Sequence, residues 1–230
     1  MTVGAIRVSV VDLVFDDPSV PVLLDDGETA RAQRFTRPVD RLRFTRARTA
    51  FKVVLAEAAG VAPGEVAVVQ RCRRCGGPHG RPVAAAADRA GLRYSLAHAG
   101  NLAAVAVADG GEVGVDIEVP VRLAIPAPAC TREELRRLSR MTPADAAAAF
   151  LRLWVRKEAY AKAVGEGLDL PFDLVVLAGD GTAKAPAHPG LVLSDFEVDG
   201  NPLAVAAPGH PVTLERHRLG AGARLVAPAG

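Results

Sequence analysis

Two acidic side chains interrupt a short apolar segment, residues 114–120, whose sequence is GVDIEVP. Its branched apolar residues alternate with Asp116 and Glu118, which is the period of a β-strand. Both carboxylates would therefore point to the same side of the strand, where their oxygens are close enough to share one partner. A cation is the simplest partner that two carboxylates can share.

A second set of candidate residues recurs at every fourth position of residues 143–165, a segment that predicts one long helix. The residues on this stripe are Phe150, Trp154, Glu158 and Lys162. Residues four apart lie on one face of a helix, so an apolar pair would be followed there by an ion pair. Taken alone, this face is more simply explained as a surface ion pair beside a core tryptophan.

The explanation changes if the helix face meets the strand face. Asp116, Glu118 and Glu158 would then converge, and three like charges need a cation such as Mg²⁺, which prefers hard oxygen ligands. Magnesium usually completes its coordination shell with water and substrate phosphate oxygens. Lys157 and Lys162 would add positive charge for the same phosphates. These residues together indicate phosphoryl or pyrophosphate chemistry.

Other segments also suit a phosphorylated ligand. Seven arginines fall between Arg31 and Arg48, where acidic residues are few, and such a basic region suits a phosphorylated small molecule or an acidic protein partner. The loop 76–82, GGPHGRP, offers backbone N–H groups and the guanidinium of Arg81. His98 ends a predicted strand, although a lone histidine in that position is more often structural.

The cysteines indicate a reducing compartment. Cys72, Cys75 and Cys130 are too few to form a disulfide framework for 230 residues, so we expect a cytoplasmic protein. Cys72 and Cys75 form half of a tetrahedral zinc site. His79 and Cys130 would complete it irregularly, and we therefore do not expect structural zinc.

The composition excludes several classes of protein. Half of the residues are hydrophobic and 4% are aromatic, which is typical of a soluble globular protein without base-stacking surfaces. The net charge of +2 gives no general field for nucleic acid. The N-terminal residues 1–15 read as a first strand rather than a signal peptide, and no apolar run is long enough to span a membrane.

The order of elements predicts an α+β protein in two similar halves, joined near residue 112. Apolar spacing predicts a helix over 39–59 that ends at Gly60, and Asp109-Gly110 between two strand-like runs predicts a hairpin. Thr131 with Glu134 predicts a capping box, and Thr142 before a proline predicts the start of the long helix. The last 60 residues read as short strands and turns.

Two segments together resemble a known family. GVDIE, followed by WVRKEAYAK, resembles the paired signature of the 4′-phosphopantetheinyl transferases, G-[IV]-D-[IV]-E and W-x-x-K-E-[AS]-x-x-K. The length, the N-terminal basic segment and HGRP are similar to the surfactin-type (Sfp-like) single-chain subgroup. The resemblance implies two pseudo-symmetric halves, each a small antiparallel sheet packed with helices, with the active site between them. Residues 1–112 would grip the nucleotide of coenzyme A, and residues 113–230 would hold the metal site and the catalytic helix.

The resemblance also implies a reaction, the transfer of 4′-phosphopantetheine from coenzyme A to a carrier-protein serine with release of 3′,5′-ADP. Asp116, Glu118 and Glu158 would hold Mg²⁺, or Mn²⁺ in its place. Glu158, or a water that it orients, would take the serine proton. Lys162 would neutralise the departing 3′,5′-ADP.

Further residues are implied to bind coenzyme A. Arg31, Arg43 and the turn Gly80-Arg81-Pro82 match positions that grip the 3′-phosphoadenosine end. Residues 94–98, YSLAH, stand where the family has F-N-x-S-H, so His98 and Ser95 would contact the cofactor. This segment departs from the family pattern at Ser95 and Ala97. Arginine also replaces the family's lysine in the Gly80-Arg81-Pro82 turn.

Two other functions stay open at this stage. The same acids would suit a Mg²⁺-dependent phosphohydrolase or nucleotidyl transferase, which needs no carrier protein. They would also suit a non-catalytic coenzyme A binding module. If the transferase function holds, the partners are acyl, polyketide or peptidyl carrier proteins of fatty acid, polyketide or nonribosomal peptide biosynthesis, and we expect the chain to act as a monomer.

Overall fold

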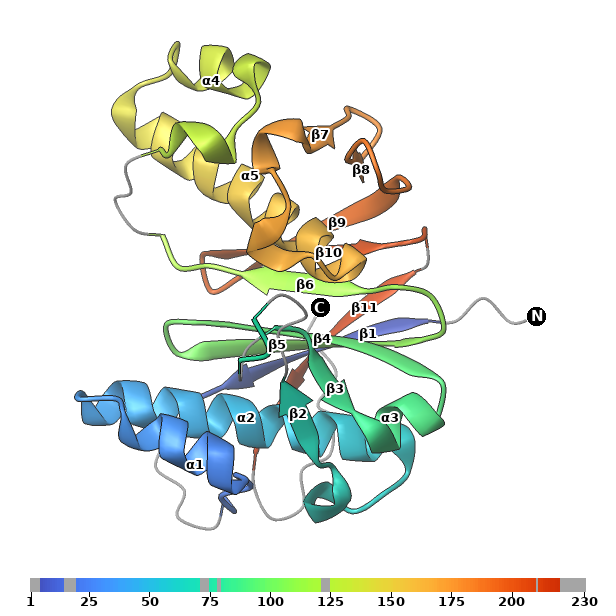
Figure 1. The fold of residues 1–230 in the computed structure, drawn as a ribbon. Helices are drawn as coiled ribbons and strands as arrows, with labels where there is room; N and C mark the ends of the chain where they lie inside the picture. The colour runs from blue at the N-terminus through green and yellow to red at the C-terminus, as the bar shows by residue number, and fades with distance from the viewer. Residues whose placement is uncertain are drawn as a thin grey trace. The chain divides into compact units, whose positions relative to one another are not determined.

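The computed structural model describes residues 5–14, 20–70, 75–77, 80–120, 125–209 and 211–219 (Figure 1). The chain divides into two compact units. The first contains Met1–Gly110 and Pro211–Gly230, and the second contains Gly111–His210. The predicted α+β class is confirmed, because each unit combines helices with a mainly antiparallel sheet.

The first unit contains a four-stranded sheet in the order β11-β1-β5-β4 and a separate pair of strands, β2-β3. Its strands are β1 (Ile6–Asp12), β2 (Val68–Gln70), β3 (Pro82–Ala84), β4 (Leu92–Ala99), β5 (Leu102–Asp109) and β11 (Val212–His217). Its helices are α1 (Asp26–Gln33), α2 (Pro38–Ala59) and α3 (Ala85–Arg89). Phe51 and Leu55 of α2 pack with Tyr94 and Val105 of the sheet, so α2 covers one sheet face.

The second unit contains a five-stranded sheet in the order β6-β10-β9-β8-β7. Its strands are β6 (Gly114–Ile117), β7 (Val176–Leu177), β8 (Thr182–Lys184), β9 (Leu191–Val198) and β10 (Asn201–Ala207). Its helices are α4 (Arg132–Leu138) and α5 (Pro143–Val164). Helix α5 lies across β6 and β10, and Ala159 and Tyr160 of α5 are buried in the same core as Ala204 and Ala206 of β10.

The two longest helices begin and end where the sequence predicts. Helix α2 ends at Gly60 and α5 at Gly165, each in the left-handed backbone conformation that favours glycine. Thr142 caps α5, and Thr131 forms the predicted capping box of α4 with Glu134. Every helix in the described ranges is too short or too polar to cross a membrane.

The predicted hairpin at Asp109-Gly110 is wrong. Strand β5 lies between β1 and β4, so both of its edges are already paired, and β6 pairs with β10 instead. The segment after Asp109 therefore connects the two units. The hairpin that the chain does make joins β4 to β5, where Ala99 pairs with Leu102. The Asp109-Gly110 pair is a local turn signal, whereas the partners of β5 and β6 include strands that are far away in the sequence.

The end of the chain also differs from the predicted division, which assigned residues 113–230 to one half. Strand β11 pairs in parallel with β1, and Val212 lies opposite Ile6. The described residues 211–219 therefore belong to the first unit. A parallel pairing across most of the chain leaves no local sequence signal, because the two strands are not joined by a turn.

A buried histidine lies at the end of this returning strand. His217 is 2% exposed, and neither ring nitrogen has a hydrogen-bond partner. Burial lowers the pKa of His217 below its usual value of 6.5, although the charges of Glu57 and Glu215 oppose this. Protonation is thus harder in the folded chain than in the unfolded one. The stability that depends on neutral His217 is present above about pH 6.5 and is lost as the pH falls below it.

We expect His217→Leu to flatten the pH dependence of stability. Between pH 7.5 and 5 the melting temperature of the natural protein should fall more steeply than that of the variant, because the variant has no imidazole to protonate. Thermal unfolding followed by circular dichroism would measure both profiles. Parallel profiles would show that His217 does not couple protons to folding.

Candidate active site

Strand β6 lies so close to α5 that Gly114 has no room for a side chain. A Cβ atom built on Gly114 would lie 1.9 Å from the carbonyl oxygen of Ala159 and 2.5 Å from the backbone nitrogen of Ala163. Both alanines are fully buried. The backbone of α5 therefore rests directly on the backbone of β6, and polar residues beside this contact are held close together.

Asp116 and Lys162 are the polar residues that meet beside this contact. Asp116 follows Gly114 by two residues on the strand and therefore points to the same side. It is 5% exposed, and its Oδ1 accepts a hydrogen bond from Lys162 Nζ at 2.6 Å. Its other oxygen, Oδ2, is buried and has no hydrogen-bond partner. One oxygen of a buried carboxylate is thus left without a donor.

Glu158 and Glu118 complete a group of three carboxylates with Asp116. Burial, with a contribution from the charges of Asp116 and Glu118, raises the pKa of Glu158 to about 7. Burial and the charge of Asp116 raise the pKa of Glu118, while a hydrogen bond from Trp154 lowers it. Burial also raises the pKa of Asp116, more than Lys162 lowers it. Lys162 lowers all three pKa values, but not enough to offset burial.

The three carboxylates suit a cation, although they do not form a complete metal-binding site. In the part of the chain that the structure describes, no three His, Cys, Asp or Glu side chains are arranged to hold a metal ion. The chemistry of the donors nevertheless fits Mg²⁺, because all three are carboxylates and Asp116 Oδ2 is buried without a donor. A divalent cation would stabilise the ionised form of Glu158, whose pKa is raised mainly by burial and further by the charges of Asp116 and Glu118.

Lys157 does not belong to this group, which corrects the prediction that it contacts phosphate. Its ammonium is fully buried and donates to Glu134 Oε2 at 2.5 Å. It also donates to the carbonyl oxygens of Phe172 at 2.8 Å and Ala129 at 3.2 Å. An ammonium has three protons, so Lys157 has none left for a ligand. Lys157 thereby connects α5 to α4 and to two 3₁₀ turns, Ala127–Ala129 and Phe172–Leu174.

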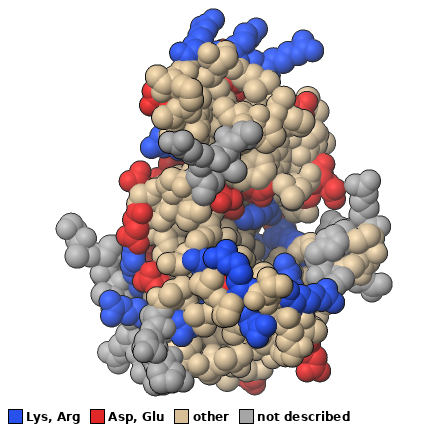
Figure 2. Space-filling view, turned by 90° about the vertical axis from the view of Figure 1, so that its left-hand side faces the viewer, with Lys and Arg blue, Asp and Glu red and all other residues tan. Residues whose placement is uncertain are grey.

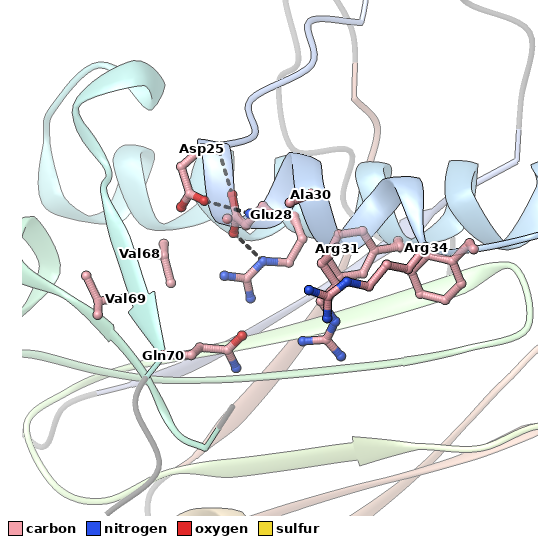
Figure 3. A pocket seen from close by; sticks show the side chains of 12 residues that line it. Asp25, Glu28, Ala30, Arg31, Arg34, Val68, Val69 and Gln70 are labelled. Carbon is pink, nitrogen blue, oxygen red and sulfur yellow. Dashed lines mark hydrogen bonds and ion pairs between the residues drawn. The ribbon is translucent and has the colours of Figure 1, made fainter. Parts of the chain in front are cut away.

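The first unit contains a cavity of about 730 Å³ (Figure 3). Arg31 of α1 and Arg34, which caps the end of that helix, line it on one side, and Val68, Val69 and Gln70 of β2 line it on the other. The cavity thus combines guanidinium groups with an apolar wall. Such a surface can take an anion together with a flat apolar group.

Glu28 and Arg48, which also line this cavity, belong to a buried ion cluster. Glu28 accepts hydrogen bonds from Arg48 Nε at 2.5 Å and Lys52 Nζ at 2.7 Å. Burial alone would raise the pKa of Glu28, but the hydrogen bond from Lys52 and the charge of Arg48 lower it below its usual value. Two cations thus share one buried carboxylate. Glu28 holds both of them in place beside the cavity.

The residues expected to grip the nucleotide are only partly brought together. Arg31 lines the cavity, with its guanidinium 5.2 Å from the centre of the Phe44 ring. Arg43 is not part of the cavity wall and donates instead to Asn101 Oδ1, at 2.6 and 3.0 Å, and to Asp40.

The turn Gly80-Arg81-Pro82 lies beside the cavity. The link is Gln70, a lining residue whose Nε2 donates to the carbonyl oxygen of Gly80 at 2.9 Å. Arg81 is half-buried in this turn, and Pro82 begins β3. Cys72 and His79, considered for a zinc site, lie outside the described residues.

Ser95 and His98 do not share a surface. They are three residues apart on β4, whose register with β5 is continuous, so their side chains point to opposite faces of the sheet. Ser95 is 7% exposed, whereas His98 is exposed. Only His98 is placed so that a ligand can reach it directly.

Four residues that the sequence analysis did not assign to the site contribute to these surfaces. Gly114 permits the close approach, Trp154 hydrogen-bonds Glu118, and Arg34 and Gln70 line the cavity. The signal for Gly114 was available, since glycine in a strand often marks close backbone approach. No comparable signal points to Gln70, because β2 meets α1 only in the folded chain.

We expect Gly114→Ala to destabilise the second unit. The added methyl group would overlap the α5 backbone, so the free energy of unfolding should fall by at least about 3 kcal/mol, the upper range for overpacking. Chemical denaturation would measure the loss. Gly179→Ala is the matched control, because nothing lies within 4 Å of a Cβ built there. Equal stability of the two variants would contradict the close approach.

We expect Lys157→Met to cost about 3–5 kcal/mol of unfolding free energy, because it leaves Glu134 buried without its cation. The double variant Lys157→Met with Glu134→Gln should recover part of this loss, since no unpaired charge then remains. Urea denaturation of both variants would measure the difference. A single variant as stable as the natural chain would show that this pair is not buried.

Comparison with known proteins relates this chain to a family. Residues 112–197 match the family model of the 4′-phosphopantetheinyl transferase superfamily. A 4′-phosphopantetheinyl transferase from Nostoc sp., HetI, is 30% identical over 198 residues, which are 80% of this chain and 78% of that protein. A relative from Synechocystis sp., also named as a 4′-phosphopantetheinyl transferase, is 30% identical over 160 residues. That alignment covers 66% of this chain and 63% of the relative, which is less than two thirds of its length. On the strength of these matches, the chain belongs to the 4′-phosphopantetheinyl transferase superfamily.

Proposed function

We propose that this protein transfers the 4′-phosphopantetheine group of coenzyme A to a serine of an acyl, polyketide or peptidyl carrier protein, with Mg²⁺ and with release of 3′,5′-ADP. The observation that carries the proposal is the group of Asp116, Glu118 and Glu158, in which Asp116 Oδ2 is buried without a hydrogen-bond donor and burial raises all three pKa values. All three carboxylates lie in the segment that matches the family model. That segment therefore contains acids suited to hold a metal-bound pyrophosphate.

Glu158 is suited to accept the serine proton. A general base works best when its pKa is near the working pH, and burial raises the pKa of Glu158 to about 7. The serine oxygen would then form a bond to the phosphorus that carries the pantetheine arm. The bond from that phosphorus to the oxygen of 3′,5′-ADP would break, and the proton would pass to Glu158 or to a water that it orients.

Asp116, Glu118 and Glu158 would hold the magnesium ion. When bound, Mg²⁺, or Mn²⁺ in its place, neutralises charge on the pyrophosphate oxygens. Lys162 now neutralises one oxygen of Asp116 at 2.6 Å. We propose that its ammonium balances charge on the departing 3′,5′-ADP during the reaction, which places it between the acids and the leaving group.

The cavity of the first unit is suited to the nucleotide end of coenzyme A. Arg31 and Arg34 offer guanidinium groups to phosphate, and Val68 and Val69 offer an apolar wall to the base. The Gly80-Arg81-Pro82 turn lies next to Gln70 at the edge of this cavity. These contacts support the proposed role of the first unit. Arg43 is engaged by Asn101, so we assign it to positioning rather than to direct contact.

His98 stays in the proposal as a contact to the coenzyme A phosphates, because its side chain is exposed at the end of β4. Ser95 faces the other way and is buried, so we expect it to support the strand. A monomer in the cytoplasm also stays part of the proposal. The cytoplasmic location rests on the small number of cysteines.

Intact-protein mass spectrometry tests the reaction directly. An apo carrier protein incubated with this protein, coenzyme A and Mg²⁺ should gain about 340 Da, the mass of phosphopantetheine, and EDTA should prevent the gain. Glu158→Gln should lower the initial rate about a hundredfold or more, as expected for loss of a general base. Asp116→Ala should abolish transfer while the fold remains. Glu197→Gln, at an exposed carboxylate on β9, is the matched control.

Three outcomes would contradict the proposal. If the Asp116→Ala variant transferred at the natural rate, Asp116 would not be needed to hold the metal ion. Release of phosphate or nucleotide from coenzyme A without a carrier would indicate a phosphohydrolase or nucleotidyl transferase. Tight coenzyme A binding without mass gain on carriers from all three pathways would indicate a binding module.

A further inference from the structure

Tyr94 of β4 is a buried tyrosine whose hydroxyl group both accepts and donates a hydrogen bond. The side chain is 6% exposed, and its ring packs against the Phe51 ring of α2, with the ring centres 5.8 Å apart. The hydroxyl accepts from the backbone N–H of Ala84 at 2.6 Å and donates to Asp88 Oδ1 at 3.1 Å. Burial raises the pKa of Tyr94 above its usual value of 10, so the hydroxyl keeps the proton that it donates.

Both partners of the Tyr94 hydroxyl lie where β3 passes into α3 (Figure 1). Ala84 is the last residue of β3 and immediately precedes α3, and Asp88 lies within α3. Ala84 is fully buried, so its backbone N–H needs an acceptor within the protein. The Tyr94 hydroxyl is that acceptor. A side chain of the four-stranded sheet therefore holds the junction between β3 and α3.

This junction also determines where one wall of the cavity in the first unit lies. Strand β3 pairs with β2, and the two strands form a sheet of their own, in which Gln70 lies opposite Pro82 and Val68 opposite Ala84. The residues of β2 line the cavity. Because β2 is paired with β3 along its length, a displacement of β3 would move this wall of the cavity.

The turn Gly80-Arg81-Pro82 is attached to the same strand. Pro82 begins β3, which is three residues long, so the start of the strand beside Arg81 moves together with its end at Ala84. The charge of Arg81 lowers the pKa of Tyr94, against the larger effect of burial, so the guanidinium lies near the hydroxyl. The position of Arg81 therefore depends on the strand that Tyr94 holds.

The position of Arg81 matters because an anion is bound best by cationic groups that are already in place. Figure 2 shows basic side chains gathered on one face of the first unit, the unit that contains Arg31, Arg34 and Arg81. Arg31 and Arg34 line the cavity, whereas Arg81 belongs to the turn beside it. If β3 were free to move, binding would first have to order this side of the cavity, and affinity would fall.

We propose that Tyr94 is a positioning residue for coenzyme A binding. Its hydroxyl holds the junction of β3 and α3, and thereby keeps the Arg81 turn and the β2 wall of the cavity in place. The inference rests on the proposed function, in which this cavity takes the nucleotide end of coenzyme A. It goes beyond that function because Tyr94 is not one of the lining residues and acts through residues that contact the ligand.

Tyr94→Phe tests the role of the hydroxyl, because the variant keeps the buried ring and removes only the oxygen. Isothermal titration calorimetry with coenzyme A and the full chain measures binding without transfer. We expect the Kd for coenzyme A to rise at least about fivefold, because the cavity wall is no longer held before the ligand arrives. Hydrogen exchange at the Ala84 amide should also become faster, since its hydrogen bond is lost.

Tyr160→Phe is the matched control, because Tyr160 in the second unit makes the same two kinds of hydrogen bond. Its hydroxyl accepts from the backbone N–H of Ala185 at 2.9 Å and donates to the carbonyl oxygen of Pro189 at 3.2 Å. The melting temperatures of Tyr94→Phe and Tyr160→Phe should agree within about two degrees. Tyr160→Phe should nevertheless bind coenzyme A within about twofold of the natural protein, because its hydroxyl does not hold the cavity wall.

Two further variants test how Tyr94 acts. Asp88→Asn keeps an oxygen acceptor for the hydroxyl and should bind coenzyme A within about twofold of the natural protein. In a chain that already carries Arg81→Ala, Tyr94→Phe should raise the Kd by a smaller factor, because Tyr94 acts partly through Arg81. In transfer assays, Tyr94→Phe should raise the KM for coenzyme A about fivefold and leave kcat and the KM for the carrier within about twofold.

Each outcome decides the proposal. Weaker coenzyme A binding by Tyr94→Phe, with unchanged binding by Tyr160→Phe, would support it. Binding by Tyr94→Phe within about twofold of the natural protein would overturn it, as would an equal loss of binding in Tyr160→Phe. If these binding results hold but no carrier gains mass, the positioning role of Tyr94 stands and the proposed reaction fails. If the natural protein does not bind coenzyme A, both fail.

Discussion

The approach of α5 to β6 at Gly114 is the constraint on which the candidate active site depends. No Cβ fits there, so two backbones meet where side chains would normally keep them apart. The consequence is electrostatic as well as geometric. Glu158 is held near Asp116, and burial removes the water that would otherwise screen their repulsion. A looser contact would let the carboxylates separate and hydrate, and their pKa values would return toward the usual range.

Buried charges elsewhere in the chain show what distinguishes this group. Lys157 has an acceptor for each of its three protons, and Glu28 is shared by two cations. Both clusters are compensated, and the pKa of Glu28 is accordingly lowered. Asp116 keeps a buried oxygen without a donor, and burial raises its pKa although Lys162 is bonded to it. Compensated charges are explained by the fold itself. The uncompensated carboxylates of the second unit are explained more simply by a ligand that brings positive charge.

Local periodicity predicted the parts of the site that depend on one element at a time. The two-residue period of the strand placed Asp116 and Glu118 on one side, and the four-residue period of the helix placed Glu158 and Lys162 on one stripe. The same rules did not reveal the partner of Lys157, because Glu134 looked like a helix cap and serves both roles. The hairpin at Asp109 failed because strand pairing depends on distant segments. The opposite directions of the Ser95 and His98 side chains follow from the two-residue period of the strand, so the sequence alone could have predicted them.

The order of residues in α5 links the packing of α4 to the candidate active site. Lys157 and Glu158 are consecutive, so their side chains leave the helix about 100° apart. Lys157 turns to Glu134 and holds α4, and Glu158 turns to Asp116 and Glu118. The group transfer proposed above needs its carboxylates in a fixed frame, because a misplacement of about 1 Å can cost a hundredfold in rate. A rigid helix that holds α4 through Lys157 and presents Glu158 as the next residue would satisfy that requirement without a moving part.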